Sequence, residues 1–335
     1  MISVLLLAGC SKQTSAPAAS PSGPATTVAP ARRLVTVSNS GQLADALSKA
    51  QAGDSILLAN ATYSGRFVMG IAGTAQAGIV IQGSRNAILD GGDINTGYVL
   101  HLQAAYCTVR GITIRNGLKG VMADRVSYNL IDSVRVYNIG EEAIHLRTFS
   151  SHNMIQRCDI SNTGLKTPDY GEGVYIGSAK NNWANYTAGN PDNSDSNQVL
   201  NNHIGPGISA ECIDIKEGTT GGLIRNNYFD ATGITGANSA DSWIDVKGNY
   251  YRIDGNTGFN PAGSVLLDGY QVHCAYSGWG NYNAFTNNNC TVNGAGYGFN
   301  IQLSGSNGNT VGNKVYTNNT VTGAAKGVSN IPLSN

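Results

Sequence analysis

Charged residues are scarce in this sequence, and the charges that are present cancel. Only 13% of the 335 residues are charged, with 21 lysines and arginines against 21 aspartates and glutamates. No net field therefore draws the chain toward nucleic acid or an anionic membrane. The cysteines show no C-x-x-C spacing, which argues against a cysteine metal motif. After Cys10 no apolar run is long enough to span a bilayer.

Glycine and tyrosine are abundant instead, with 43 and 16 residues, and 41% of the chain is hydrophobic. This composition is typical of an all-β protein with many tight turns and an adequate core. Five cysteines follow Cys10. Because this number is odd, at least one thiol has no partner within the chain. If a bridge forms, Cys274 with Cys290 is the pair that we expect.

The first ten residues, MISVLLLAGC, are an apolar run that ends in small residues before a cysteine. They resemble the lipobox of bacterial lipoproteins, which implies lipidation of Cys10. Residues 11–33 are rich in Ser, Pro, Ala and Thr and form a linker, and residues 34–335 form the folded domain. We expect an exported monomer, secreted or held at the cell surface by its lipid anchor.

Short strands recur along the chain with apolar residues at their third and fifth positions. The segments EAIHLR, EGVYIG, ECIDIK and SWIDVK begin at 142, 172, 211 and 242, and GYQVH and GFNIQ continue the pattern. A second series, which includes LNNHI, IRNNYF and IDGNT, keeps step with the first and aligns Asn202, Asn227, Asn256, Asn288 and Asn318. Stacked asparagines at a turn bond each other and the turn backbone. Coils that share one continuous core predict a single-stranded right-handed parallel β-helix.

The segment of residues 38–65 contains a predicted helix that closes the first coil, and the first strands follow it. Ser40 is placed to cap it, and Gly53 ends it. Its apolar face consists of Leu43, Ala46, Leu47 and Ala50. This opening and the coils after it resemble the pectate-lyase-like superfamily of exported β-helix proteins. The resemblance covers residue 34 to the end and implies the fold, whereas the activity must come from a site.

Successive side chains of a strand alternate between its faces, so the residues between the apolar positions face outward. One outward column reads His145, Tyr175, Asp214, Asp245, Gln271 and Asn300, and the next reads Arg147, Gly177, Lys216, Lys247, His273 and Gln302. Glu142, Glu172 and Glu211 stand at the strand entrances. This concentration of ionisable groups in a chain with few charges predicts a functional site.

β-Elimination from a uronic-acid polysaccharide requires a base beside a neutralised carboxylate. Lys216 and Lys247 lie on adjacent rungs, where a cationic neighbour lowers a lysine pKa and neighbouring carboxylates raise it. We expect Ca²⁺, which prefers several oxygen ligands, on the acidic groups. The expected ligands are Asp214, Asp245, Glu211 and Glu172.

The stretch ECIDIK is similar to a rung of the chondroitinase B and alginate lyase group. That resemblance implies that Glu211 is a calcium ligand and Lys216 the base, with Lys247 at the position of the group's arginine. We expect Lys247 and Arg147 to bind the substrate carboxylate and Tyr175 or His145 to donate a proton. His273, Gln271 and Trp243 are the expected substrate contacts, and Trp183, Tyr186 and Trp279 are further candidates for stacking on sugar rings.

The sequence therefore predicts a polysaccharide lyase whose partner is an acidic polysaccharide. Two alternatives stay open. A glycoside hydrolase could use paired carboxylates. Asp214 and Asp245 on adjacent rungs fit the roughly 5 Å spacing of retaining enzymes, and Glu172 with Asp245, two rungs apart, could reach the roughly 6.5 to 9.5 Å of inverting ones. A non-catalytic surface glycan-binding protein would bind sugars and calcium without an essential lysine.

Overall fold

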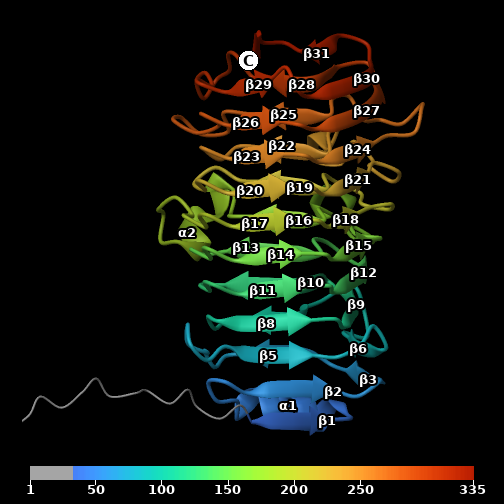
Figure 1. Ribbon diagram of the computed structural model, residues 1–335, viewed down its shortest axis with the longest axis vertical. Helices are drawn as coiled ribbons and strands as arrows, with labels where there is room; N and C mark the ends of the chain where they lie inside the picture. The colour runs from blue at the N-terminus through green and yellow to red at the C-terminus, as the bar shows by residue number, and fades with distance from the viewer. Residues whose placement is uncertain (1–32) are drawn as a thin grey trace, which may run out of the picture.

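The computed structural model describes residues 33–335, which form one parallel β-helix. The chain runs through three parallel sheets in turn, so that each coil adds one strand to each sheet, and the coils stack along the long axis (Figure 1). The right-handed parallel β-helix predicted from the repeats is confirmed. Within residues 33–335, no helix is long and apolar enough to cross a membrane. The predictions for residues 1–32, including lipidation of Cys10, lie outside the described part.

Sheet A contains twelve strands: β1 (Leu34–Val37), β2 (Ser55–Leu58), β5 (Ile79–Gln82), β8 (Cys107–Arg110), β11 (Leu130–Asp132), β14 (Met154–Gln156), β17 (Gln198–Leu200), β20 (Leu223–Arg225), β23 (Arg252–Asp254), β26 (Ala284–Thr286), β29 (Lys314–Tyr316) and β32 (Leu333–Ser334). Sheet B contains ten: β3 (Ala61–Ser64), β6 (Ala87–Asp90), β9 (Thr113–Gly117), β12 (Arg135–Ile139), β15 (Asp159–Ser161), β18 (His203–Ile204), β21 (Tyr228–Asp230), β24 (Thr257–Phe259), β27 (Asn289–Gly294) and β30 (Thr320–Ala324). Sheet C also contains ten: β4 (Phe67–Met69), β7 (Tyr98–Leu102), β10 (Lys119–Asp124), β13 (Ile144–Arg147), β16 (Val174–Ile176), β19 (Ile213–Ile215), β22 (Ile244–Val246), β25 (Tyr270–Val272), β28 (Tyr297–Ile301) and β31 (Gly327–Ser329). The helical segments are α1 (Ser40–Ser48), α2 (Trp183–Tyr186) and the short 3₁₀ turns η1 (Pro168–Tyr170), η2 (Lys180–Asn182) and η3 (Ala237–Ser239).

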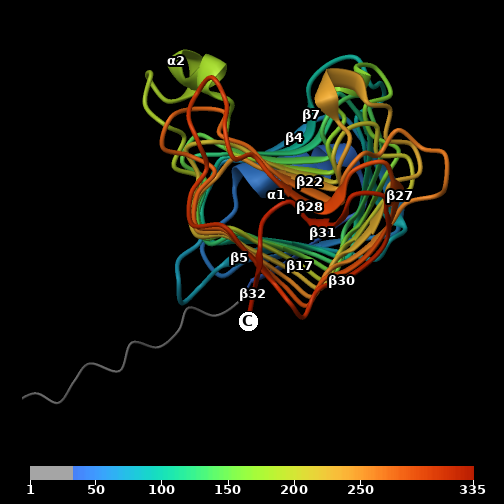
Figure 2. The ribbon, with the colours of Figure 1, turned by 90° about the horizontal axis from the view of Figure 1, so that it is seen from above.

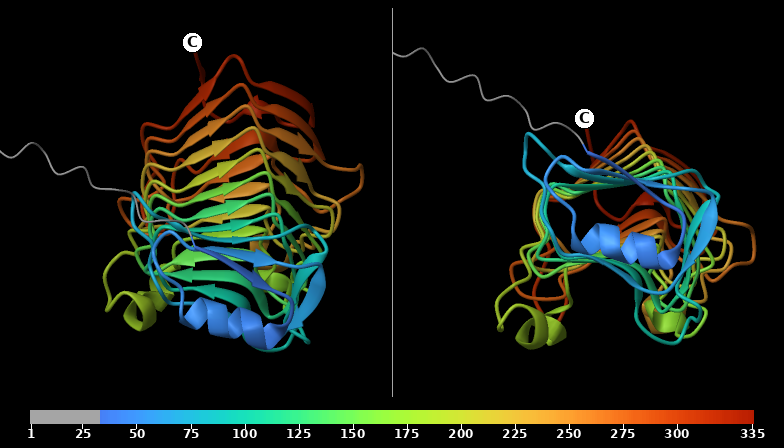
Figure 3. Two further views of the ribbon diagram at one scale, coloured as in Figure 1. Left: turned by 60° about the horizontal axis from the view of Figure 1, so that its bottom comes forward. Right: turned by 90° about the horizontal axis from the view of Figure 1, so that it is seen from below.

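The N-terminal end of the coil is closed by α1, which lies across the opening when the molecule is seen from below (Figure 3). Leu43 and Leu47 lie on the inner face of α1 and are buried, as their spacing predicted. The cap is one residue earlier than expected, because the Asn39 side chain and not that of Ser40 accepts a hydrogen bond from the Gln42 amide. The helix keeps the first rung from exposing its apolar interior and its unpaired edge.

Stacked asparagines line one turn of the coil from rung to rung. The side-chain amide of Asn202 donates to Asn227, that of Asn227 donates to Asn256, and the ladder continues through Asn288, with N–O distances of 2.9–3.0 Å. Its last member is Asn319 and not the predicted Asn318. Asn318 instead pairs with Asn287 at an exposed position. In a run of consecutive asparagines, composition does not tell which one points inward.

The core is a continuous column of inward side chains from all three sheets. Trp243 belongs to it: the side chain is fully buried, so the prediction that it contacts substrate is wrong. The chain bends at Ser242 and Trp243 before β22 begins, so strict alternation does not apply to this residue. Cys274 and Cys290 are both buried and free, and the expected disulfide is absent. The Cys290 side chain packs inside the core of the coil, which separates it from the turn that holds Cys274.

Candidate active site

The outward columns of sheet C match the sequence prediction residue by residue. His145 pairs in register with Tyr175, Tyr175 with Asp214, and Asp214 with Asp245. Adjacent strands are about 4.8 Å apart, so four ionisable side chains lie along one line of the sheet. The second column lies two residues further along the chain than the first. The Lys216 amide donates to the carbonyl oxygen of Ile176, and the Lys247 amide donates to that of Ile215.

Long insertions on both sides of sheet C turn this face into a covered cleft. The insertion that carries η2 and α2 stands at one edge of the sheet, and other loops rise at the opposite edge (Figure 2). A cavity of about 560 Å³ lies between them, lined by Lys119, Glu141, Glu142, Tyr170, Glu172, Tyr175, Ala179, Asn181, Asn182, Tyr186, Lys216 and Asn238. The outward residues are therefore buried, with only 2% of Asp214 and 8% of Tyr175 exposed.

A second cavity of about 320 Å³ adjoins the first and shares Lys216 and Asn238 with it. Its floor is a network of two lysines and two aspartates. Lys216 Nζ lies 2.5 Å from Asp214 Oδ2, and Lys247 Nζ lies 2.8 Å from Asp214 Oδ1 and 2.7 Å from Asp245 Oδ2. Burial works to lower the pKa of Lys216, but the carboxylates of Asp214 and Glu172 outweigh it and raise that pKa. Lys216 is therefore an ammonium group while those carboxylates are uncompensated.

Three of the four predicted metal ligands come together. One oxygen each from Glu172, Glu211 and Asp214 lie within 4.8 Å of one another, and all three residues are buried. Glu172 Oε2 has no hydrogen-bond partner within residues 33–335. Burial and neighbouring carboxylates raise the pKa of Glu172 well above its usual range, and burial together with Asp214 raises that of Glu211 to about 8. Excess carboxylate charge of this kind fits a bound divalent cation.

Asp245 is not part of this triad, although it lines the second cavity with Glu211 and Asp214, and it holds His273. His273 Nδ1 lies 2.8 Å from Asp245 Oδ1, and the Asp245 carboxylate raises the pKa of His273. Gln271 is held by Asp241 and Asp268, to which its amide donates over 2.7 and 2.9 Å. His273 lines the second cavity, whereas Gln271 and Trp243 line neither cavity.

The His145 and Tyr175 rings are in contact, with centroids 4.3 Å apart and an angle of 56° between their planes. His145 Nε2 bonds the carbonyl oxygen of Gly177 over 2.9 Å, and Nδ1 lies 3.4 Å from Glu142 Oε1. Burial and the Asp214 carboxylate raise the pKa of Tyr175, so its phenol stays protonated. Tyr175 lines the cavity and His145 supports it from behind.

Arg147 lies two rungs from Lys216, in a cluster that the sequence did not predict. Its Nε donates to Asp124 Oδ1 over 2.7 Å, and His101 Nε2 lies 2.9 Å from Asp124 Oδ2. The guanidinium carbon lies 4.0 Å from the centroid of the Tyr186 ring in α2. Asp124 and Tyr186 thus fix the direction of the only predicted arginine of the site.

We expect Asp124→Asn to destabilise the protein by about 2 kcal/mol at pH 7, which is typical of a hydrogen bond between charged groups. Burial works to raise the pKa of Asp124, but hydrogen bonds from His101 and Arg147 lower it overall. A lowered pKa gives stability that is present above the ordinary carboxyl pKa of about 4 and is lost as the pH falls toward the folded-state pKa. The difference from wild type should therefore shrink below about pH 4.

Denaturant unfolding between pH 3 and pH 7 measures this difference. The exposed Asp169→Asn serves as the control and should match wild type throughout. A difference that stays constant over that pH range would show that the charge of Asp124 contributes nothing.

Several residues of the site were missed from the sequence, above all two on β10: Lys119, which lines the cavity, and Asp124, which holds Arg147. The segment KGVMADR carries Val121 and Ala123 at the same inward positions as the later rungs, and β10 pairs in register with β13. Extending the alignment by one coil would have found both residues. The contribution of Tyr170 and Asn238 comes from inserted loops, for which no periodic signal exists.

A covered cleft along sheet C, with lysine, tyrosine and clustered carboxylates, is the arrangement of a β-helix polysaccharide lyase. Among solved structures, an alginate lyase from Paenibacillus sp. str. FPU-7 is 37% identical, with a TM-score of 0.83 over 90% of this chain and 99% of that one. The chain belongs to the polysaccharide lyase family that includes this enzyme. Membership favours the lyase over the hydrolase and the non-catalytic protein that the sequence left open.

More distant structures share the fold alone. A pectate lyase is 15% identical with a TM-score of 0.64, covering 90% of this chain and 78% of its own. A mannuronic acid specific family 6 lyase from human gut microbiota is 15% identical with a TM-score of 0.61, covering 87% and 65%. No family model matches the chain, and no curated protein matches it.

Proposed function

We propose that this enzyme cleaves alginate by β-elimination in the cleft over sheet C. The observation that carries the proposal is that Lys216 and Tyr175 meet in one cavity beside three buried carboxylates. Lys216 Nζ lies 4.9 Å from the centroid of the Tyr175 ring. The choice of alginate is supported by the 37% identical relative, an alginate lyase.

β-Elimination breaks the bond between the glycosidic oxygen and its ring carbon in the uronate. A base removes the proton beside the carboxylate, the electron pair of that C–H bond forms a C=C bond, and the glycosidic oxygen leaves with the bonding pair. In our proposal Lys216 accepts the proton as a neutral amine. Tyr175, whose phenol is protonated, is positioned to supply a proton to the leaving oxygen.

The substrate carboxylate needs positive partners, because the proton beside an ionised carboxylate is very weakly acidic. Lys247 and Arg147 are the cations that we propose for this role, and His273 contacts the sugar in the adjoining cavity. Lys247 is held by Asp214 and Asp245, and Arg147 by Asp124. Because these side chains are already held in place, they lose little conformational freedom when they bind a charged substrate.

We further propose that Glu172, Glu211 and Asp214 bind Ca²⁺, since hard carboxylate oxygens suit this ion. The unpaired Glu172 oxygen and the raised pKa values of both glutamates support it. A cation there would offset the carboxylate charge that keeps Lys216 protonated. Asp245, the fourth ligand expected from the sequence, lies outside the triad and pairs with Lys247 and His273.

The proposed function is tested by incubating the purified protein with alginate, pectate and chondroitin. Unsaturated uronate ends absorb in the ultraviolet, and we expect absorbance to rise with alginate. Reducing ends that form without absorbance would mean hydrolysis and overturn the elimination. Absorbance with another polyuronate alone would retain the elimination and overturn the choice of alginate.

Calcium should raise the thermal stability of the wild type. A ligand that binds only the folded state stabilises it by about 2.7 kcal/mol at 100 times its Kd. We expect Glu172→Gln to abolish this gain, because it removes charge from the triad without changing its shape. Melting curves with calcium or chelator measure the effect, and Glu141→Gln, in the same cavity but outside the triad, should keep it. Equal gains in wild type and Glu172→Gln would place the ion elsewhere.

A further inference from the structure

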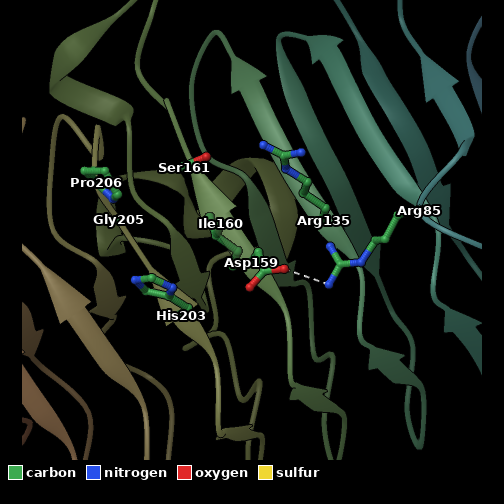
Figure 4. A pocket seen from close by; sticks show the side chains of 8 residues that line it. All are labelled: Arg85, Arg135, Asp159, Ile160, Ser161, His203, Gly205 and Pro206. Atoms are coloured by element: carbon green, nitrogen blue, oxygen red, sulfur yellow. Dashed lines mark ion pairs between the residues drawn. The ribbon is translucent and has the colours of Figure 1, made fainter.

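A third cavity lies on sheet B, away from the cleft over sheet C. It has a volume of about 350 Å³ and is lined by Arg85, Arg135, Asp159, Ile160, Ser161, His203, Gly205 and Pro206 (Figure 4). Arg135, Asp159 and His203 begin the successive strands β12, β15 and β18. None of these residues belongs to the lyase site described above.

The outward residues of these strands form a column of their own. Arg135 pairs in register with Asp159, Asp159 with His203, and His203 with Tyr228 on β21. With strands about 4.8 Å apart, Arg135 and His203 are separated by about 10 Å. An extended ligand that follows the coil axis can therefore meet a cation, a histidine and an aromatic ring in sequence.

Positive charge exceeds negative charge in this column. Arg85 Nη2 is paired with Asp159 Oδ2 over 2.8 Å, as the dashed line in Figure 4 shows. Arg85 Nη1 is shielded from solvent and has no hydrogen-bond partner within residues 33–335. Arg135 forms no ion pair in the described part of the chain, and its guanidinium carbon lies 4.6 Å from the centroid of the Tyr137 ring. The guanidinium of Arg135 thus remains available to an anion, and the Arg85 side chain lines the same cavity.

The aromatic end of the column offers a surface for sugar rings. The His203 and Tyr228 rings are in edge contact, with centroids 4.9 Å apart and an angle of 80° between their planes. Both residues are exposed, with 37% of Tyr228 accessible. Aromatic faces pack against the apolar faces of sugars, and Arg forms paired hydrogen bonds with carboxylates.

We propose that the column from Arg135 to Tyr228 is an accessory binding site for an acidic polysaccharide chain. A uronate carboxylate binds Arg135, with the positive charge of Arg85 in the same cavity, and a later sugar of the same chain packs on His203 and Tyr228. The choice of a polyuronate rests on the proposed function. A chain held on sheet B stays close to the cleft on sheet C, so its effective concentration there increases.

The test compares Arg135→Glu with Lys314→Glu, which makes the same charge reversal at an exposed position on sheet A. We expect Arg135→Glu to raise the KM for polymeric alginate about tenfold, the loss expected when one charged hydrogen bond is removed. Activity on an alginate tetrasaccharide, too short to occupy both sites, should be unchanged. Lys314→Glu should match wild type on both substrates.

Electrophoresis through gels that contain polysaccharide tests binding without turnover, with both changes placed in a Lys216→Ala protein. Retardation by alginate should fall with Arg135→Glu and persist with Lys314→Glu, and a neutral polysaccharide should retard neither. Equal retardation of both variants, or an equal loss in both, would overturn the accessory site. If wild type does not cleave alginate, the proposed function fails, and retardation by pectate or chondroitin still decides the accessory site.

Discussion

We expect Lys216→Ala to lower kcat/KM on the substrate polysaccharide by a factor of about 10² to 10⁴, the usual contribution of a positioned acid or base. The side chain is the proposed acceptor of the proton. Within residues 33–335 the one other amine that lines the cavity beside Tyr175 is Lys119, which is paired with Glu141 and Glu142. The fold should survive the change. Asp214 keeps its ion pair with Lys247 at 2.8 Å, so the carboxylate paired with Lys216 retains a cation.

Ultraviolet absorbance of unsaturated ends measures the loss, and melting curves establish that the variant is folded. Lys216→Arg separates charge from proton transfer, because arginine keeps the positive charge and cannot act as a neutral base near pH 7. We expect it to be as inactive as the alanine variant. Lys314→Ala, exposed on sheet A, should be fully active. A folded Lys216→Ala protein with more than about a tenth of wild-type activity would remove Lys216 from the reaction.

We expect Trp243→Ala to destabilise the protein by about 3 to 5 kcal/mol, the range for removal of a large buried aromatic side chain. The indole is fully buried, and its N–H donates to the Phe259 carbonyl over 3.2 Å. Gly258 makes room for it, because a Cβ at that position would lie 2.5 Å from the indole ring. Truncation therefore leaves a cavity between sheets B and C that no neighbouring side chain fills.

Denaturant unfolding followed by circular dichroism gives this free energy. Trp279→Ala is the matched control, since Trp279 lies half-buried in a loop outside the core. Its cost should be about 1 kcal/mol or less, as is usual near a surface. Similar costs for the two variants would mean that the packing of Trp243 is not what stabilises these rungs.

The sequence predicted the columns of sheet C because side-chain alternation in a strand is a local property. Once Ile144, Val174, Ile213 and Ile244 are aligned as inward residues, the positions of their outward neighbours follow from the period of two. Register between rungs followed as well, since each coil must place its apolar residues in the shared core. His145, Tyr175, Asp214 and Asp245 consequently lie where the repeat placed them.

Residues outside the regular strands could not be placed in this way. Trp243 precedes its strand at a bend, Asn319 was one residue from the predicted ladder position, and the inserted loops that carry Tyr186 and Asn238 have no repeat to align. Their positions depend on contacts between segments far apart in the chain. No spacing rule describes such contacts.

The sequence by itself determined the β-helix, its closing helix and the identity of the outward groups, because each follows from short-range periodicity and residue type. Only the tertiary structure decided what those groups do to one another. Loops from both edges bury the face, and burial raises the pKa values of Glu172 and Glu211. The fold also brings both glutamates together with Asp214. Desolvation and charge proximity depend on distances through space, which a linear pattern does not contain.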